Sequence, residues 1–243
     1  MPRYYTRVCN FYYGSVSKSL VKKRKALPLN GNKKLSFDEV EIISVKSKKK
    51  INKKEINNLP SKIKKIVKKD IKLITKRKKN FKNLSFKDIP KIMGILNITP
   101  DSFSDGGKYD QNRLAKKQLD YLFKSGAHLV DIGGESTRPG SKSISAKIEW
   151  NRIKSTLKKI NKKKMISIDT RKSVIMEKGI KLGVKLINDV SGLNFDKNSI
   201  NILKKYKTPF VLQHSLGNPD VMQNSPKYRN VLIDIYDFFK KKI

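Results

Sequence analysis

Residues 91–133, KIMGILNITPDSFSDGGKYDQNRLAKKQLDYLFKSGAHLVDIG, decide the fold. The stretch begins with the apolar run KIMGILNI (91–98) and ends with a second one, HLVDIG (128–133). Between them lies an amphipathic pattern that stops at Gly126, and a glycine just past a helix tolerates the left-handed conformation of a C-terminal cap. The stretch therefore predicts a strand, a helix and a second strand.

The same alternation continues along the rest of the chain. Three further apolar runs are separated by helical patterns: MISID (165–169), VKLINDV (184–190) and PFVLQH (209–214). Gly183 ends one of these helical patterns, as Gly126 ends the first. Short buried runs that alternate with helices indicate repeated βα units, so we predict an α/β fold with five parallel strands.

The first 90 residues differ in composition from the rest. Up to Pro90 there are 27 basic and 6 acidic residues, against 30 and 14 afterwards. An apolar alternation that begins at Leu35 predicts a strand. Apolar residues at spacings of three and four predict an amphipathic helix: Ile63, Ile66, Val67, Ile71 and Ile74. We expect this helix to pack on the neighbouring domain, with acidic lipid or nucleic acid as the alternative. The chain is thus divided into a basic, Lys-rich α+β extension, 1–90, and a second domain, 91–243.

The charge of the chain bears on its partners. A formal net charge of +37 suits a nucleic-acid binder. Only nine of the 57 basic residues are Arg, however, and Arg is the residue that reads base edges and phosphates with a bidentate fork. An A+T-rich coding sequence accounts for the excess of Lys, so we expect no specific nucleic-acid partner. A basic nucleic-acid binder is kept as the alternative from another class; binding that high salt abolishes, without sequence preference, would mark mere charge attraction.

Cysteine usage and hydropathy indicate a cytoplasmic location. Cys9 is the only cysteine, so the chain has no internal disulfide and suits a reducing compartment. No segment approaches the roughly 20 apolar residues of a membrane span. The first residues, MPRYYTRVCNFYYG, lack the apolar stretch of a secretory signal.

Polar residues follow each apolar run directly. Along the chain these are Asn97, Thr99, Asp101 and Ser102; Asp131, Glu135, Ser136, Thr137 and Arg138; Asp169, Thr170 and Arg171; Asn188 and Asp189; Gln213 and His214. Because ligands bind at the carboxyl ends of parallel strands, we expect these side chains to face one pocket. For any single Asp or Asn, a turn former or helix cap is the alternative role.

The loops after the first two runs have the composition of an anion site. NITPDSFSDGGKY (97–109) and GGESTRPGS (133–141) combine hydroxyls, glycines and one Arg, which suits phosphate or diphosphate. Asn97 and Asp101 offer hard oxygen ligands for Mg²⁺ bridged to a diphosphate. Flexible loops without a ligand are the alternative.

Asp169 and Asn188 end adjacent strands, and we expect them to be the most buried polar candidates. A desolvated carboxylate needs hydrogen-bond donors. An aminopyrimidinone ring presents a matching row of N–H donors, with acceptors that an Asn amide can reach. The alternative is a mutual hydrogen bond of the two residues inside the sheet.

Five strings of the second domain together resemble dihydropteroate synthase. They are IMGILNITPDSFSDGG (92–107), LVDIGGESTRPGS (129–141), ISIDTRK (166–172), INDVSG (187–192) and HSLGNPDVMQNSPKY (214–228). The resemblance covers residues 91 to about 240 and implies a TIM barrel that joins 4-aminobenzoate to hydroxymethyl-dihydropterin diphosphate. Diphosphate is released, and dihydropteroate is formed for folate synthesis. The family is a sulfonamide target and is usually a homodimer with no membrane span. The first 90 residues weakly resemble the extension of some alphaproteobacterial members.

The resemblance also implies roles for single residues. It makes Asn97 the Mg²⁺ ligand, and Asp101 and Arg138 catalytic residues. It also implies that Thr137 contacts the diphosphate substrate, and that Arg138 with Pro139 belongs to the second loop, which helps to form the aminobenzoate site. The substrate-binding residues that it implies are Thr137, Arg138, Pro139, Asp169 and Asn188. His214 keeps its place in the family pattern, and we expect it to be structural.

Five strands fall short of the eight of a TIM barrel. We therefore expect a partial TIM (β/α)8 barrel, strands 1–5 of 8, without the helices that form the family's dimer surface. A gene fragment, a truncated chain and one part of a split protein are the alternatives, and we expect little synthase activity from these 243 residues alone. A methyltetrahydrofolate-dependent methyltransferase is the related alternative, although its substrate has no diphosphate for the two loops to bind.

Overall fold

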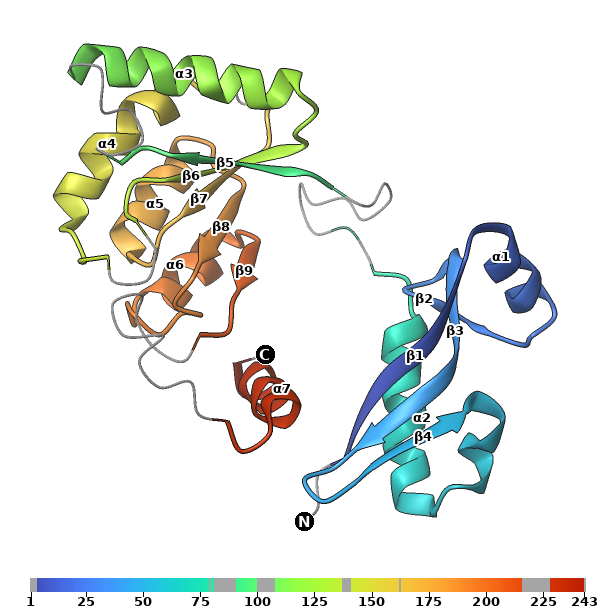
Figure 1. Cartoon of the computed structure of the whole chain (residues 1–243). Coiled ribbons are helices and arrows are strands. Elements are labelled where there is room, and N and C mark those ends of the chain that lie inside the picture. The colour runs from blue at the N-terminus through green and yellow to red at the C-terminus, as the bar shows by residue number, and fades with distance from the viewer. Residues whose placement is uncertain are drawn as a thin grey trace. The chain divides into compact units, whose positions relative to one another are not determined.

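The computed structural model describes residues 4–78, 80, 91–99, 108–136, 141–161, 163–215 and 228–242. The chain divides into two compact units, which are described separately (Figure 1). The first contains Met1–Lys79 and Tyr228–Ile243, and the second contains Asn80–Lys227. The boundary expected at residue 90 lies outside the described residues.

The second unit is built on a five-stranded parallel sheet in the order β5-β6-β7-β8-β9. Its strands are β5 (Met93–Asn97), β6 (Leu129–Gly133), β7 (Ile166–Asp169), β8 (Leu186–Asp189) and β9 (Phe210–Leu212). Each strand pairs with its neighbour in sequence, which is the strand order of a (β/α) barrel and differs from that of a doubly wound sheet. The predicted α/β class and all five predicted strands are confirmed.

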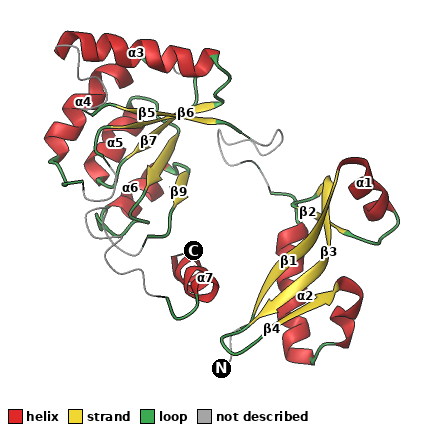
Figure 2. Ribbon diagram, viewed as in Figure 1, coloured by secondary structure: helices red, strands yellow, loops and turns green. Residues whose placement is uncertain are grey.

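Four helices connect these strands and cover one face of the sheet (Figure 2). They are α3 (Lys108–Lys124), α4 (Ala146–Lys158), α5 (Ser173–Lys181) and α6 (Ser199–Tyr206). Gly126 and Gly183, just past α3 and α5, both have φ of +101°, which confirms the two helix stops expected from the sequence.

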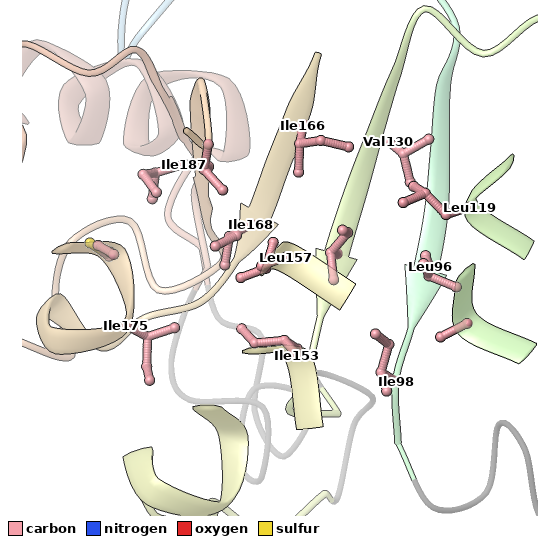
Figure 3. Packing of buried hydrophobic residues seen from close by; sticks show 14 of the residues in the cluster. Leu96, Ile98, Leu119, Val130, Ile153, Leu157, Ile166, Ile168, Ile175 and Ile187 are labelled. Atoms are coloured by element: carbon pink, nitrogen blue, oxygen red, sulfur yellow. The ribbon is translucent and has the colours of Figure 1, made fainter. Parts of the chain in front are cut away.

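The core of the second unit lies between this sheet and its helices (Figure 3). Alternate strand residues point into it, among them Leu96, Ile132 and Ile168, because side chains alternate between the two faces of a strand. A Cβ added to Gly179 of α5 would lie 2.2 Å from Ile168 Cδ1, so the glycine permits the close approach of that helix to β7. The other face of the sheet carries Ile95, which is 64% exposed, together with polar residues.

The first unit contains a four-stranded antiparallel sheet with β3 (Asn32–Ile43) at its centre. β1 (Tyr5–Tyr13) pairs along one edge of β3, and β2 (Leu27–Leu29) and β4 (Lys48–Asn52) pair along the other. The strand expected from Leu35 onward is thus confirmed as part of β3. Helix α1 (Gly14–Lys22) follows β1, and its Ser17 donates a hydrogen bond to Ser36 of β3.

Helix α2 (Ser61–Thr75) of the first unit follows a short 3₁₀ helix, Lys53–Asn58, and confirms the predicted amphipathic helix. Its apolar stripe packs on the sheet of its own unit, in a cluster that contains Phe37, Val40 and Val67. The expectation that this stripe packs on the neighbouring domain is wrong, because the apolar residues of β3 already occupy it.

The last helix, α7 (Val231–Lys242), belongs to the first unit. Ile233 is buried against Tyr5 and Ile43, and the ring of Tyr236 stacks on that of Tyr5 with the centroids 3.8 Å apart. The Tyr5 hydroxyl also donates a hydrogen bond to Asp237. Sequence periodicity predicts this helix, but it does not predict that the apolar face of the helix packs on β1 and β3.

Among the described residues, none of the helices has the length and apolar composition that crossing a membrane would require.

Candidate functional site

Four residues at the carboxyl ends of adjacent strands form one row across the sheet. Asn97 of β5 pairs with Gly133 of β6, Gly133 with Asp169 of β7, and Asp169 with Asn188 of β8. A Cβ on Gly133 would lie 3.1 Å from Asn97 Oδ1 and 3.8 Å from Asp169 Oδ2. The bare backbone of Gly133 therefore leaves room between an amide oxygen and a carboxylate. The structure brings together Asn97, Asp169 and Asn188, as the sequence predicts.

Asn188 is held by a carboxylate two strands away. Its Nδ2 donates a hydrogen bond of 2.8 Å to Oδ2 of Asp131 on β6, so its side chain reaches past β7. The sequence left open a hydrogen bond between Asn188 and Asp169, but the Asn188 amide donates to Asp131 instead. Asp131 is only 4% exposed, whereas Asp169 and Asn188 are half-buried. The expectation that Asp169 and Asn188 are the most buried polar candidates is therefore wrong, because both lie at strand ends, whereas Asp131 lies in the middle of β6.

Asp169 carries the carboxyl group of the row, and its pKa is strongly shifted. Burial, followed by the negative charge of Asp131, raises its pKa from 3.8 to about 7. Its Oδ1 is buried and has no hydrogen-bond partner among the described residues. A desolvated carboxylate without donors is satisfied when a ligand supplies them, so this atom is suited to receive N–H groups.

A buried network of four charged side chains lies beside the row. Lys172 Nζ is 2.9 Å from Glu135 Oε2 and 2.7 Å from Glu149 Oε2, and Arg171 Nε is 3.1 Å from Glu135 Oε2. The Arg171 guanidinium also lies over the ring of Phe195, 4.2 Å from its centroid. The network ties the ends of β6 and β7 to the first turn of α4.

Glu135 also connects the two sides of the loop after β6. Its Oε1 accepts hydrogen bonds from Ile144 N, at 2.9 Å, and from Ser143 Oγ, at 3.2 Å. Burial alone would raise the pKa of Glu135, but hydrogen bonds from Arg171 and Lys172 outweigh it and lower the pKa to about 2. Glu135 is therefore an anchor for this loop that is ionised at neutral pH.

Asp189, another strand-end candidate, has a structural role. Its Oδ1 accepts from Ser191 N at 2.8 Å and from Ser191 Oγ at 2.6 Å, and its Oδ2 accepts from Leu193 N at 3.2 Å. These bonds stabilise the turn after β8, which is the alternative role that the sequence left open. His214 lies two residues beyond β9, and its structural role stays a prediction.

Several predicted site residues lie outside the described residues: Asp101, Ser102, Thr137, Arg138 and Pro139. Among the described residues, no group of three or more His, Cys, Asp or Glu could hold a metal ion. The predicted ligand Asn97 is exposed, and its Oδ1 faces the space left by Gly133. A single hard amide oxygen fits Mg²⁺, because this ion usually keeps several waters and binds mainly to substrate phosphates.

Sequence reasoning missed the roles of Glu149 and Lys172 and the contact between Asp131 and Asn188. The string ISIDTRK places Lys172 three residues after Asp169, which was the available signal for a cation near the strand end. Glu149 lies in a helical pattern, where an acidic residue in the first turn is ordinary. Its full burial is visible only in the folded chain.

The model of the family described as "Pterin binding enzyme" matches residues 93–243. The curated dihydropteroate synthase of Neisseria meningitidis serogroup B is 45% identical over 159 residues, which is 64% of this chain and 55% of that protein. The Escherichia coli dihydropteroate synthase is 36% identical over 156 residues, 63% of this chain and 55% of that protein. The chain thus spans about half the length of the curated relatives that it matches.

Solved structures of similar proteins agree with the sheet described above. A Clostridium difficile dihydropteroate synthase, determined in the presence of pteroic acid, has a TM-score of 0.57 and 39% identity over 63% of this chain and 56% of that one. A Yersinia pestis dihydropteroate synthase, in a sulfonamide drug complex, has a TM-score of 0.57 and 37% identity, again over 63% of this chain and 56% of that one. The predicted likeness to part of a TIM barrel is confirmed by these neighbours.

Proposed function

Because the chain belongs to the pterin-binding enzyme family, we propose that it acts as a dihydropteroate synthase. The reaction joins (7,8-dihydropterin-6-yl)methyl diphosphate to 4-aminobenzoate and gives 7,8-dihydropteroate and diphosphate. The observation that carries the proposal is the row of Asn97, Gly133, Asp169 and Asn188 at the carboxyl ends of four parallel strands. In parallel α/β sheets, ligands bind at this end.

Asp169 and Asn188 bind the pterin ring in this proposal. The aminopyrimidinone part of the ring carries adjacent N–H donors, and the Asp169 carboxylate can accept two of them at once. The unpartnered, buried Oδ1 of Asp169 supports this role, because the ring would supply the donors that the described residues do not. Asn188 offers an amide oxygen from the next strand.

Asn97 holds Mg²⁺ in this proposal, and the loops that follow β5 and β6 bind the diphosphate. Thr137, Arg138 and Pro139 follow Glu135 by two to four residues, and Asp101 follows Asn97 by four residues. When bound, Mg²⁺ supplies positive charge that offsets the charge on the leaving diphosphate. Glu135 supports the loop after β6, because its carboxylate binds Ser143 and Ile144 on the far side of that loop.

The chemistry is a substitution at the methylene carbon of the pterin. The bond between this carbon and the diphosphate oxygen breaks, the bond to the arylamine nitrogen forms, and the amine loses one proton. The residues described here bind and orient the pterin ring, and Arg138 is the proposed catalytic cation for the diphosphate. Positioning and charge stabilisation then account for the lowering of the barrier, and no nucleophilic side chain is required.

Differential scanning fluorimetry of the purified chain tests the proposal. We expect the melting temperature to rise when the pterin diphosphate and Mg²⁺ are both present. A sulfonamide is expected to raise it further only in their presence, since the drug takes the place of 4-aminobenzoate. Asp169→Asn removes the rise, whereas Asp120→Asn, the same change at an exposed site on α3, retains it. No rise for the unaltered chain, or an equal rise in Asp169→Asn, would contradict the proposal.

The location, the drug response and the assembly of the protein are also proposals. A cytoplasmic location is supported by the single cysteine, Cys9, which suits a reducing compartment. A sulfonamide response is supported by the Yersinia pestis relative, whose solved structure is a sulfonamide drug complex. A homodimer rests on the family resemblance alone.

A further inference from the structure

We propose that Asp131 is a positioning residue that fixes the Asn188 amide with its oxygen toward the ligand, so that the site selects pterins by their ring N–H donors. The inference rests on the proposed function and assigns a specificity role to a residue that does not itself need to touch the ligand. It is carried by the hydrogen bond that joins these two side chains across β7.

The chemistry of the two groups decides which way the amide points. An ionised carboxylate accepts hydrogen bonds and donates none, so Asp131 Oδ2 takes the NH₂ end of Asn188, at 2.8 Å. The Oδ1 end of the amide must then point away from Asp131. Asp131 is buried, which leaves few alternative positions for its side chain.

Strand register fixes the place of Asp131 beside the path of the Asn188 side chain. Burial raises the pKa of Asp131, and the hydrogen bond from Asn188 acts in the opposite direction. Asp131 of β6 pairs in register with Ser167 of β7. The Asp131 carboxylate therefore lies next to β7, the strand that the Asn188 side chain crosses to reach it. The orientation of the amide is therefore set by neighbours within the sheet, before any ligand binds.

With Asn188 held in this way, the row offers acceptors to a ring. Asp169 presents a carboxyl group, and Asn188 presents Oδ1. A 7,8-dihydropterin carries an N–H at ring position 8, where the oxidised pterin has only a lone pair. A site of acceptors favours the form with the additional donor, and one such hydrogen bond corresponds to a preference of up to about tenfold. If Asn188 could rotate its amide, the NH₂ end would serve the oxidised form equally well.

Isothermal titration calorimetry with two probes tests the inference under anaerobic conditions. The probes are 6-hydroxymethyl-7,8-dihydropterin and 6-hydroxymethylpterin, neither of which carries a diphosphate. We expect the unaltered chain to bind the dihydro form about tenfold more tightly. In Asp131→Asn, a side chain of the same shape can donate to Asn188 Oδ1 and release the amide, so the ratio of the two Kd values falls toward one. Asp120→Asn is the matched control and keeps the ratio.

The ratio separates a positioning role from a merely structural one. If Asp131 only stabilised the fold, Asp131→Asn would weaken both probes by the same factor and leave the ratio unchanged, which would overturn the inference. Should Asp131→Asn fail to fold, Asp131→Ser takes its place, because a hydroxyl can donate or accept and no longer dictates the amide orientation; an unchanged ratio there has the same meaning. Failure of both probes to bind the unaltered chain contradicts the proposed function and the inference together, whereas binding with an unaltered ratio in the variants contradicts the inference alone.

Discussion

Lys172 Nζ lies 2.7 Å from Oε2 of Glu149, and Glu149 is fully buried. The same ammonium group lies 2.9 Å from Glu135, so one cation joins α4 to the end of β6. Glu149 Oε1 has no hydrogen-bond partner among the described residues, which makes the fold depend on Lys172 to compensate this charge. A buried ion pair therefore joins the carboxyl end of the sheet, where the proposed site lies, to helix α4.

The substitution Lys172→Met tests this dependence. It leaves a buried carboxylate without its cation, and we expect the free energy of unfolding to fall by about 3–5 kcal/mol. Urea denaturation measures the change. Lys205→Met removes the cation of an exposed pair with Glu177, and we expect almost no effect there. Equal losses in the two variants would show that burial is not the cause.

The Glu135 carboxylate makes the stability of the folded chain depend on pH in the acid range. Its pKa is about 2 in the folded chain against an ordinary value of 4.5, because hydrogen bonds from Arg171 and Lys172 outweigh the effect of burial. A lowered pKa contributes stability that is fully present above pH 4.5 and is lost as the pH falls through 2. We expect the urea midpoint to decline in this window and Glu135→Gln to flatten the decline. An identical profile in Glu135→Gln would argue against this source.

Asp169 has the opposite dependence. Burial and the charge of Asp131 raise its pKa from 3.8 to about 7. Its contribution to stability is thus fully present below pH 3.8 and is lost as the pH rises through 7, because the folded chain binds the proton more tightly than the unfolded chain. We expect Asp169→Asn to be more stable than the unaltered chain at pH 8 and nearly equal to it at pH 3.5. Thermal melts at both pH values measure this, and a constant difference would contradict the shift.

Gly133→Ala tests whether the ligand occupies the space between Asn97 and Asp169. The new Cβ would lie 3.1 Å from Asn97 Oδ1 and 3.6 Å from Asp169 Cβ. We expect at least a tenfold loss of affinity for the pterin diphosphate with Mg²⁺, measured by calorimetry, while the chain stays folded. Gly94→Ala is the control, because its Cβ would meet Leu122 at 3.2 Å on the helix side of the sheet. A similar affinity loss in both variants would mean that packing is responsible.

Ile233→Ala tests the attachment of α7 to the first unit. Ile233 is buried against Tyr5 and Ile43, and we expect its truncation to cost about 2 kcal/mol or more of local stability. Hydrogen exchange of the α7 amides reports the change. Val231→Ala, at an exposed position of the same helix, is expected to leave the exchange rates nearly unaltered. Unchanged protection in Ile233→Ala would mean that other contacts hold the helix.

Much of the second unit could be predicted because its pattern is local. Each of the five strands is a short apolar run, and Gly126 and Gly183 end helices through a backbone preference of glycine itself. The pairing of Asn97, Asp169 and Asn188 across strands followed from one further rule, that parallel strands present their carboxyl ends at a common edge. The surfaces on which α2 and α7 pack could not be predicted in this way. An apolar stripe indicates that one face of a helix is buried, but it does not identify the element that covers this face.

The amino-acid sequence by itself determined the α/β class, the five parallel strands and the residues at their ends, because periodicity and turn chemistry act between near neighbours in the chain. Only the tertiary structure decided that Asn188 is held by Asp131, that Lys172 lies between two carboxylates and that the pKa of Asp169 rises to about 7. These features arise from contacts between residues far apart in sequence and from the removal of water around them. Strand register and burial determine both, and neither is a property of any short segment.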